Sequence, residues 1–309
     1  MALGVHFGLD TSNYTTSAAG VSPAGEVFCA KRPLAVPQGD RGMRQSDALF
    51  CHTRDLPEVV AECLEAAAGR SVLSVGASET PRRVEGSYMP CFLAGVNAAK
   101  CAAALLGVPY LGFSHQEGHI EAARFGALLE GRELCGEAFL ALHLSGGTTE
   151  LLLVREDGFR YRTELLFDTL DLTCGQLIDR CGVALGLPFP AGAHLEALAL
   201  KSEKRYRVRV PRKDTGINLS GFENQFRRRM QEGERPEDLA RFVFDAVIAA
   251  VTALLEAAGR ESLPVLFSGG VSSSAILRGH FSSERYFFAP PALSADNAVG
   301  IARLAGKGV

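Results

Sequence analysis

Three stretches of the chain share one pattern, an apolar strand-like run that stops at small hydroxyl and glycine residues. They are VHFGLDTSNYTTSAAGV (5–21), FLALHLSGGTTELLLV (139–154) and LPVLFSGGVSSSAILRGHF (263–281). The first two continue through a turn into a second strand, whereas the third leads into a helical pattern. Because a strand followed by SGG occurs in both halves of the chain, the pattern predicts two related lobes, each built on a sheet.

The three turns also indicate a chemistry. Glycines let backbone N–H groups approach an anion closely, and hydroxyl groups add further donors. The chain contains neither G-x-x-x-x-G-K-[ST] nor G-x-G-x-x-G, so the turns are not a P-loop or a Rossmann fingerprint. Any one of these glycine pairs is equally consistent with an ordinary turn. Together they favour a phosphate-handling cleft, with the candidate catalytic residues Asp10 and Ser145 at the first two turns.

Helical patterns lie between these strands, and the alternation predicts an α/β fold. In the first pattern Pro57 falls near the expected first turn, and His52, just before it, is either functional or a capping or surface residue. A chain of 309 residues is expected to divide, since single cores stop growing at about 250 to 300 residues. We predict lobes at 1–133 and 134–309, with the last helix packed back on the first lobe. The clearest helical patterns are 56–69, 92–107, 191–200 and 239–259.

The composition indicates which binding partners and which cellular compartment to expect. The net charge of −3 gives no overall attraction to nucleic acid or to an anionic membrane, so any RNA contact must be local. The sequence has no secretory signal pattern and no apolar run long enough for a membrane span, which predicts a cytoplasmic protein. Its eight cysteines include no C-x-x-C pair, which disfavours a zinc ribbon or a disulfide framework.

Two basic segments stand out against this acidic background. One is KSEKRYRVRVPRKD at 201–214, and the other is the run Arg227, Arg228 and Arg229. Each is consistent with an RNA-facing patch. Each is equally consistent with a solvated edge.

The octapeptide SHQEGHIE at 114–121 contains two histidines four positions apart. On a helix, the rings of His115 and His119 lie one turn apart, a spacing that suits a single metal ion. Glu117 is not placed as in H-E-x-x-H, which disfavours metalloprotease chemistry. A third ligand is available in Asp296, beside Asn297, although an aspartate before a helix also serves as an N-cap.

Six motifs follow one another along the chain: HQEGH (115–119), LSGGTTEL (144–151), TLDLTCGQLIDR (169–180), LGLPFPAG (185–192), SGGVSSSAILR (268–278) and SADNAVGIA (294–302). In this order and at about this spacing they resemble the TsaD family, also called the Gcp or glycoprotease family, which transfers threonylcarbamoyl to transfer RNA. The resemblance spans nearly the whole chain. It implies a two-lobed, actin-like fold of the sugar kinase and heat-shock chaperone type, with a nucleotide between the lobes.

The same resemblance implies a set of site residues and ligands. One divalent metal ion, iron or zinc, is bound by His115, His119 and Asp296 and polarises the carbonyl of a threonylcarbamoyl-adenylate substrate. The acceptor is a tRNA adenosine, and a smaller paralogous partner of the TsaB type is expected. The residues implied to bind the adenylate or ATP-type nucleotide are Ser145, Gly146, Gly147, Thr148, Asp179, Gly192, Gly269, Gly270 and Ser274.

The chain departs from the family pattern at several polar positions. Compared with the usual residues, Thr148 replaces a histidine, Gln176 a glutamate, Glu223 a lysine and Ser274 an asparagine, and DTSNYTTS (10–17) lacks an acidic pair. The leading hypothesis is a metal-dependent transferase acting on tRNA. The alternative is a non-catalytic nucleotide-binding scaffold, and the peptidase hypothesis behind the family's older name is the weakest, because Gln116 stands where a glutamate is needed beside His115.

Overall fold

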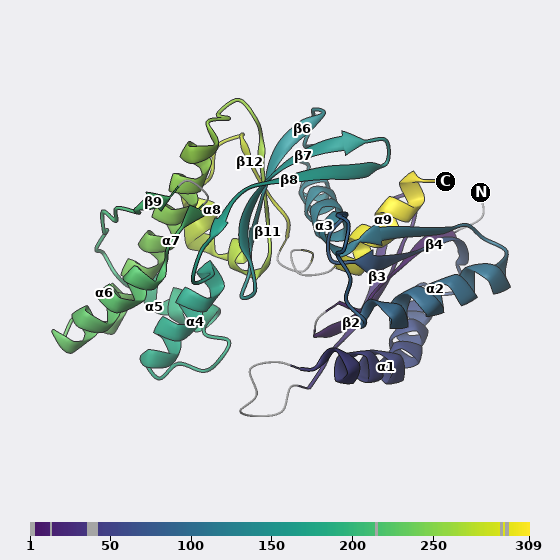
Figure 1. Ribbon diagram of the computed structural model, residues 1–309, viewed down its shortest axis with the longest axis horizontal. Coiled ribbons are helices and arrows are strands. Elements are labelled where there is room, and N and C mark those ends of the chain that lie inside the picture. Colours follow the sequence, from purple (N-terminus) through teal and green to yellow (C-terminus); the bar gives the residue numbers. More distant parts are fainter. Residues whose placement is uncertain (1–3, 13, 36–42, 214–215, 291–292, 294–296) are drawn as a thin grey trace. The chain divides into compact units, whose positions relative to one another are not determined.

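The computed structural model describes residues 4–12, 14–35, 43–213, 216–290, 293 and 297–309 (Figure 1). The chain divides into two compact units, which we describe one at a time. The first unit combines Met1–Phe125, Glu156–Arg162 and Ala295–Val309, and the second combines Gly126–Arg155 and Thr163–Ser294.

The first unit is built on a sheet that, among the described residues, has five strands in the order β3-β2-β1-β4-β5. β1 pairs antiparallel with β2 and parallel with β4. β2 pairs antiparallel with β3, and β4 pairs parallel with β5. The strands are β1 (Gly4–Asp10), β2 (Thr15–Val21), β3 (Val27–Pro33), β4 (Ser71–Thr80) and β5 (Tyr110–Ser114).

Helices from both ends of the sequence pack on this sheet. Apolar side chains such as Phe7, Val59 and Ala99 form a core between the sheet and two of these helices. The last helix of the chain packs on β1 and β4. The helices are α1 (Gln45–Ala66), α2 (Phe92–Leu106), α3 (His115–Leu129), whose final residues enter the second unit, and α9 (Asn297–Lys307).

The second unit contains the larger sheet, with the order β12-β11-β6-β7-β8-β10-β9 among the described residues. β6 pairs antiparallel with β7 and parallel with β11, which in turn pairs parallel with β12. The strands are β6 (Ala138–Leu144), β7 (Thr149–Asp157), β8 (Arg160–Thr169), β9 (Arg212–Lys213), β10 (Gly216–Ile217), β11 (Val265–Ser268) and β12 (Tyr286–Phe288). β7 and β8 also extend into the residues 156–162 of the first unit.

The core of the second unit lies around its longest helix, α7, whose apolar side chains pack with those of β6, β7 and β11. Because α7 is buried along most of its length, its sequence is apolar on nearly every side. The helices of this unit are α4 (Cys174–Ala184), α5 (Gly192–Ala199), α6 (Ser220–Gln231), α7 (Pro236–Ala258), the short 3₁₀ turn η1 (Gly270–Ser273) and α8 (Ala275–His280).

The two sheets repeat one topology. In each, the first strand has an antiparallel neighbour on one side and a parallel neighbour on the other, and β1 and β4 correspond to β6 and β11. The predicted strands before the three turns are confirmed, since β1 ends at Asp10, β6 at Leu144 and β11 at Ser268. The prediction of related lobes from the repeated strand and turn is therefore supported by the strand order.

The start predicted for the first helix is wrong. α1 begins at Gln45, and Pro57 lies inside it rather than in its first turn. His52 is a fully buried residue of this helix, and its Nδ1 lies 2.8 Å from the Thr16 hydroxyl. It is therefore neither a cap nor a surface residue.

Two further expectations concern cysteines and membrane spans. The eight cysteines all lie among the described residues, and no disulfide joins them there. Within the described ranges, no helix combines the length and the apolar character needed to cross a membrane.

Candidate functional site

The first helical residue of α3 is His115, and a capping box fixes it there. The backbone N–H of Ser114 donates to Glu117 Oε2 at 2.8 Å, and the backbone N–H of Glu117 donates to the Ser114 hydroxyl at 3.2 Å. Glu117 is buried and forms an ion pair with Arg160 at 3.1 Å. Its carboxylate thus anchors the start of the helix, which leaves the two histidines to form a separate group.

The rings of His115 and His119 lie side by side, as the helical spacing predicts. Their centroids are 4.5 Å apart at an interplanar angle of 71°. Nδ1 of His115 lies 2.8 Å from Oδ2 of Asp10, at the end of β1. The structure therefore brings together three predicted site residues, one from the first strand and two from the helix after the fifth.

Asp10 is held from several sides and is only 2% exposed. Its Oδ1 accepts from the backbone N–H and the hydroxyl of Ser12, and its Oδ2 accepts from the Ser78 hydroxyl. Burial alone raises the pKa of the Asp10 carboxyl, but the facing imidazole of His115 and the two serine hydroxyls together lower that pKa below its ordinary value. Asp10 is therefore an ionised, fixed acceptor that orients the ring of His115.

α9 completes this side of the site. A Cβ placed on Gly300 of α9 would lie 1.9 Å from the carbonyl oxygen of Gly118, so α3 and α9 meet at two glycines. This close approach places Nδ2 of Asn297 3.1 Å from Nδ1 of His115. Oδ1 of Asn297 is buried without a hydrogen-bond partner. The third predicted metal ligand, Asp296, lies outside the described residues.

These residues fit a metal ion in part. Nδ1 of His115 faces the Asp10 carboxylate, and a carboxylate in this position typically supports a metal-bound imidazole. Nε2 of His115 lies 3.3 Å from Nδ2 of Asn297 and 3.5 Å from the Ser12 hydroxyl. The neighbouring imidazole of His119 supplies a second nitrogen. Among the described residues, no group of three His, Cys, Asp or Glu side chains is arranged to hold a metal. The described part of the chain thus brings two imidazoles together without a third group that could complete a metal site.

In the second unit, the SGG turn after β6 is held by Ser145 itself. The Ser145 hydroxyl accepts from the backbone N–H groups of Gly147 at 3.2 Å and Thr148 at 2.9 Å. Gly146 and Gly147 are exposed, and no atom lies within 4 Å of a Cβ built on either. Two of the amide groups expected to face an anion are thus engaged inside the turn, while the outer side of the glycines is open.

The N-terminus of α4 packs against this turn. The Thr173 hydroxyl donates to the carbonyl of Gly146 at 3.0 Å, and a Cβ on Gly175 would lie 2.5 Å from the carbonyl oxygen of Ser145. Thr173 and Gln176 form a second capping box at the start of this helix. A helix N-terminus carries partial positive charge, which favours an anion near this turn.

The third turn lies beside the second one. Ser268 pairs with His143 in the parallel β11–β6 ladder, so both strands end at the same edge. Gly269 has a φ of +85°, and a Cβ there would lie 2.3 Å from the carbonyl oxygen of Leu144. The predicted residues Gly269 and Gly270 therefore adjoin the turn that begins at Ser145.

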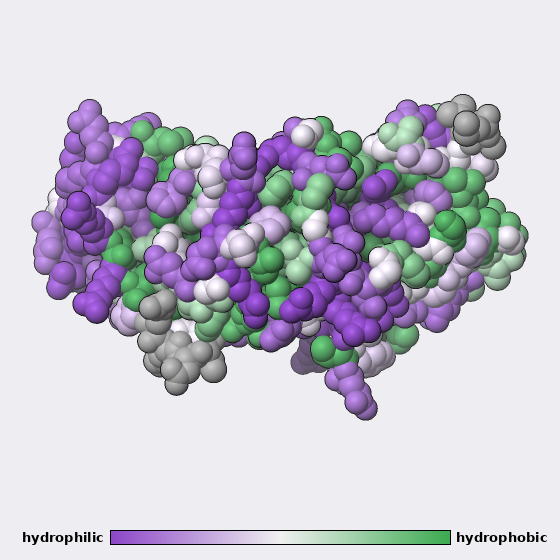
Figure 2. Space-filling model, turned by 90° about the horizontal axis from the view of Figure 1, so that it is seen from above, coloured by the Kyte–Doolittle hydropathy of each residue, from purple (hydrophilic) through white to green (hydrophobic). Residues whose placement is uncertain are grey.

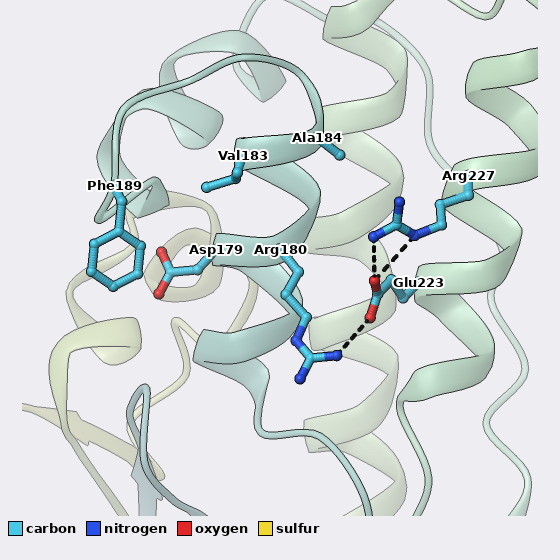
Figure 3. Close-up of a pocket in the computed structure, with 7 residues that line it drawn as sticks. All are labelled: Asp179, Arg180, Val183, Ala184, Phe189, Glu223 and Arg227. Carbon is cyan, nitrogen blue, oxygen red and sulfur yellow. Dashed lines mark hydrogen bonds and ion pairs between the residues drawn. The ribbon is translucent and has the colours of Figure 1, made fainter. Parts of the chain in front are cut away.

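The predicted ribose-binding pair, Asp179 and Gly192, also comes together. Oδ1 of Asp179 accepts from the backbone N–H of Ala191 at 2.8 Å, directly before Gly192 at the start of α5. Figure 3 shows Asp179 and Arg180 on α4 at a pocket of about 520 Å³, with Phe189 beside Asp179. The remaining residues that line it are Val183, Ala184, Glu223 and Arg227.

Three of the residues that replace usual family residues have a local side-chain partner. Gln176 completes the capping box of α4, a position that accepts either glutamate or glutamine. Ser274 caps α8 by accepting from the backbone N–H of Leu277 at 3.3 Å, and its hydroxyl also donates to Glu196. Glu223 forms ion pairs with Arg180 at 3.3 Å and Arg227 at 2.7 Å (Figure 3).

Sequence reasoning missed several members of the first group. Ser78 and Ser12, which hold Asp10, carry no sequence signal beyond their small polar side chains. The capping box S-x-x-E at 114–117 is a recognisable signal, and it shows that Glu117 supports the helix start. Asn297 could have been found only through the contact of α9 with α3.

Comparison with known proteins adds an independent line of evidence. The family model described as tRNA N6-adenosine threonylcarbamoyltransferase, TsaD, matches residues 39–303. The protein of that name from Methanopyrus kandleri is 29% identical over 297 residues, which cover 91% of this chain and 81% of the relative. The one from Enterococcus faecalis is 32% identical over 253 residues, 73% of this chain and 70% of the relative. The match covers 56% of the relative from Carboxydothermus hydrogenoformans and 64% of the relative from Pelobacter propionicus.

Solved structures support the fold at low sequence identity. HypF from T. kodakarensis aligns with a TM-score of 0.62 at 14% identity, over 100% of this chain and 48% of HypF. This likeness concerns the fold alone, and it agrees with the predicted actin-like α/β fold of two lobes. The match of the family model over most of the sequence shows that the chain belongs to the TsaD family.

Proposed function

We propose that this chain is a metal-dependent transferase that moves threonylcarbamoyl from an adenylate to N6 of a tRNA adenosine. The family as a whole is named for tRNA threonylcarbamoyladenosine biosynthesis. The observation that carries the proposal for this chain is the group formed by Asp10, His115 and His119. A scaffold that only binds nucleotide has no need of a buried carboxylate that orients one of two adjacent imidazoles.

His115 and His119 would hold the metal, with Asp296 as the expected third ligand. When bound, the metal would act as a Lewis acid that polarises the carbamoyl carbonyl. Asp10 is best described as a positioning residue, because its oxygens are occupied by Ser12, Ser78 and His115. Its negative charge keeps the His115 ring in one orientation with Nε2 free of the carboxylate.

The second unit would bind the adenylate. The open glycines at 146 and 147 and the start of α4 favour a phosphate, and the pocket beside Asp179 has room for the ribose. In the transfer, the N6 amine attacks the carbamoyl carbon and a new C–N bond forms. The bond from that carbon to the phosphate oxygen breaks, AMP leaves with the electron pair, and the amine loses a proton.

The test is mass-spectrometric detection of threonylcarbamoyladenosine in unmodified tRNA incubated with metal-loaded protein, a TsaB-type partner and threonylcarbamoyl-adenylate. We expect product with the unchanged protein and none with His119→Ala. Metal content is measured on the same samples, and His194→Ala, an exposed histidine on α5, serves as the control for metal loss. Absence of product from the unchanged protein, while another TsaD family member is active in the same mixture, would refute the proposal.

A further inference from the structure

The two basic segments differ in how their charges are satisfied. In the run at 227–229, each arginine has a carboxylate partner: Arg227 with Glu223, Arg228 with Glu232 and Arg229 with Glu234. Their charge is largely neutralised where they stand. This run therefore offers little attraction to a polyanion.

The segment at 205–210 is extended and alternates between two faces. Tyr206, Val208 and Val210 pack against the apolar core of the second unit. Arg205, Arg207 and Arg209 are exposed, and no ion pair joins any of them to another described residue. Arg205 donates to the backbone carbonyls of Ser202 and Lys204, which leaves its charge uncompensated.

These arginines line one wall of a groove of about 1150 Å³. The other wall is α7 from Arg241 to Glu256, a length of about 22 Å at 1.5 Å per residue, and His280 lies at its side. Asp245 accepts from the backbone N–H of Tyr206 at 2.8 Å and pairs with Arg241, so its charge is balanced and it fastens the segment to α7. Figure 2 shows hydrophilic residues gathered over the end of the second unit that carries α6 and α7.

The spacing and the lining indicate which polyanion fits. Alternate residues of an extended segment lie about 6.6 Å apart, so arginines recur at about this spacing along the groove wall. Guanidinium groups bind phosphate oxygens through paired N–H donors. Tyr206 packs edge-on against Phe242, with ring centroids 5.5 Å apart, so it is not available as a platform on which a base could stack. The exposed arginines therefore suit this groove to a phosphate backbone.

We propose that the groove between residues 205–211 and α7 binds the phosphate backbone of a double-stranded RNA stem. The proposal rests on the proposed function in one respect, since it takes the stem to belong to the tRNA substrate. It assigns to this surface the role of holding the acceptor through its backbone, without reading its sequence.

The test measures binding of an unmodified tRNA transcript and of a 12-base-pair RNA duplex by fluorescence anisotropy at several salt concentrations. In R205Q/R207Q/R209Q, we expect affinity for both to fall at least about tenfold, and the slope of log K against log salt to flatten by about 2 to 3. The matched control is R162Q/R228Q/R235Q, which removes three exposed but ion-paired arginines. The control is expected to change the affinity less than about twofold.

A second variant, expected to increase RNA affinity, tests whether the weaker binding of the triple arginine variant reflects lost charge or lost folding. Glu256 is exposed on the groove wall and has no ion pair among the described residues. Glu256→Gln should therefore tighten binding of the duplex about twofold to fivefold. Unchanged binding in the triple arginine variant, or equal affinity for polyglutamate and for the duplex, would overturn the proposal.

The two proposals fail in different ways. Groove variants that lose RNA binding, in a protein that makes no product with any tRNA, would support the RNA groove and count against the transferase. Product formed at the normal rate and KM by the triple arginine variant would support the transferase and count against the groove.

Discussion

The turns after β1 and after β6 occupy the same position in the two repeated sheets, yet they carry different chemistry. After β1 stands Asp10, a buried carboxylate that faces an imidazole from α3. After β6 stand Ser145 and two glycines, with the N-terminus of α4 packed against them. The repeated topology supplies two equivalent places at the end of a strand: in one a carboxylate orients an imidazole, and in the other two glycines leave the turn open.

The comparison also shows how each turn is supported. The first is held by side chains from distant strands and helices, such as Ser78 and His115. The second is held mainly by its own hydroxyl and by the helix that follows β7 and β8. Changes to a distant element should therefore affect the two turns differently.

The largest effect is expected from Gly300→Ala. The new Cβ would lie 1.9 Å from the backbone carbonyl of Gly118, so α9 must shift away from α3. We expect the free energy of unfolding, measured in urea, to fall by about 3 kcal/mol, and bound metal to be lost. Gly279→Ala, where no atom lies within 4 Å of the new Cβ, is the control and should be nearly neutral.

The corresponding change in the second unit sharpens the contrast. Gly175→Ala would press on the carbonyl of Ser145 and should destabilise the protein while leaving metal bound at the histidines. If both glycine variants lose metal equally, the two turns do not act independently.

A smaller effect is expected at the residues of the turns themselves. Asp10→Asn preserves shape but removes the charge that orients His115, so metal affinity should fall about 10- to 100-fold in competition with a chelator. Ser145→Ala should leave metal affinity unchanged and loosen only the second turn. Equal metal affinity in Asp10→Asn and the unchanged protein would contradict the role given to Asp10.

Loss of either capping box should lower the free energy of unfolding by less than the glycine substitutions do. Ser114→Ala and Thr173→Ala each remove an N-cap acceptor, at a cost of about 1 kcal/mol in the free energy of unfolding. Gln176→Glu keeps the box and should change stability by less than about 0.5 kcal/mol. A large loss in Gln176→Glu would show that the amide has a role beyond the cap.

The smallest effect is a pH dependence in the second unit. Burial raises the pKa of Asp171, but hydrogen bonds from the Ser220 hydroxyl and from backbone N–H groups, including that of Leu219, lower it on balance. A depressed pKa adds stability above the unfolded value of about 3.9, and that stability is lost as the pH falls through the folded pKa.

Because Asp171 is exposed, its contribution at pH 7 should stay below about 1 kcal/mol. Urea unfolding of Asp171→Asn should therefore show a small deficit at pH 7 that becomes smaller at about pH 3. A deficit of the same size at both pH values would assign the effect to shape and not to charge.

Much of the fold could be predicted from the sequence, because the strands before the three turns are apolar and end abruptly at polar residues. The helical spacing of His115 and His119 was sufficient to predict adjacent rings. α1 was placed too late because its buried positions include His52 and Asp55, and these polar residues interrupt the apolar period that marks a helix. Pro57 was then interpreted as a helix start.

The candidate site was less predictable, because it depends on contacts between distant segments. The hydrogen bond from Ser78 to Asp10 joins residues 68 positions apart. Only Gly118 and Gly300 hint at the close approach of α3 to α9, and glycines also occur in helices that make no such approach. Local patterns specify strands and caps, whereas the surroundings of Asp10 follow from the packing of the whole unit.

The packing of α9 on β1 and β4 has a consequence for the order of folding. Asn297 and His115 are 182 positions apart, so the imidazole pair gains its full surroundings only after α9 has been synthesised. At about 5 to 20 residues per second, many seconds would pass between synthesis of the first sheet and synthesis of α9. During that time the face of the sheet that contacts α9 would lack this helix. A chain truncated before α9 would therefore carry both histidines and still lack Asn297, so the surroundings of the imidazole pair depend on a segment that is synthesised long after it.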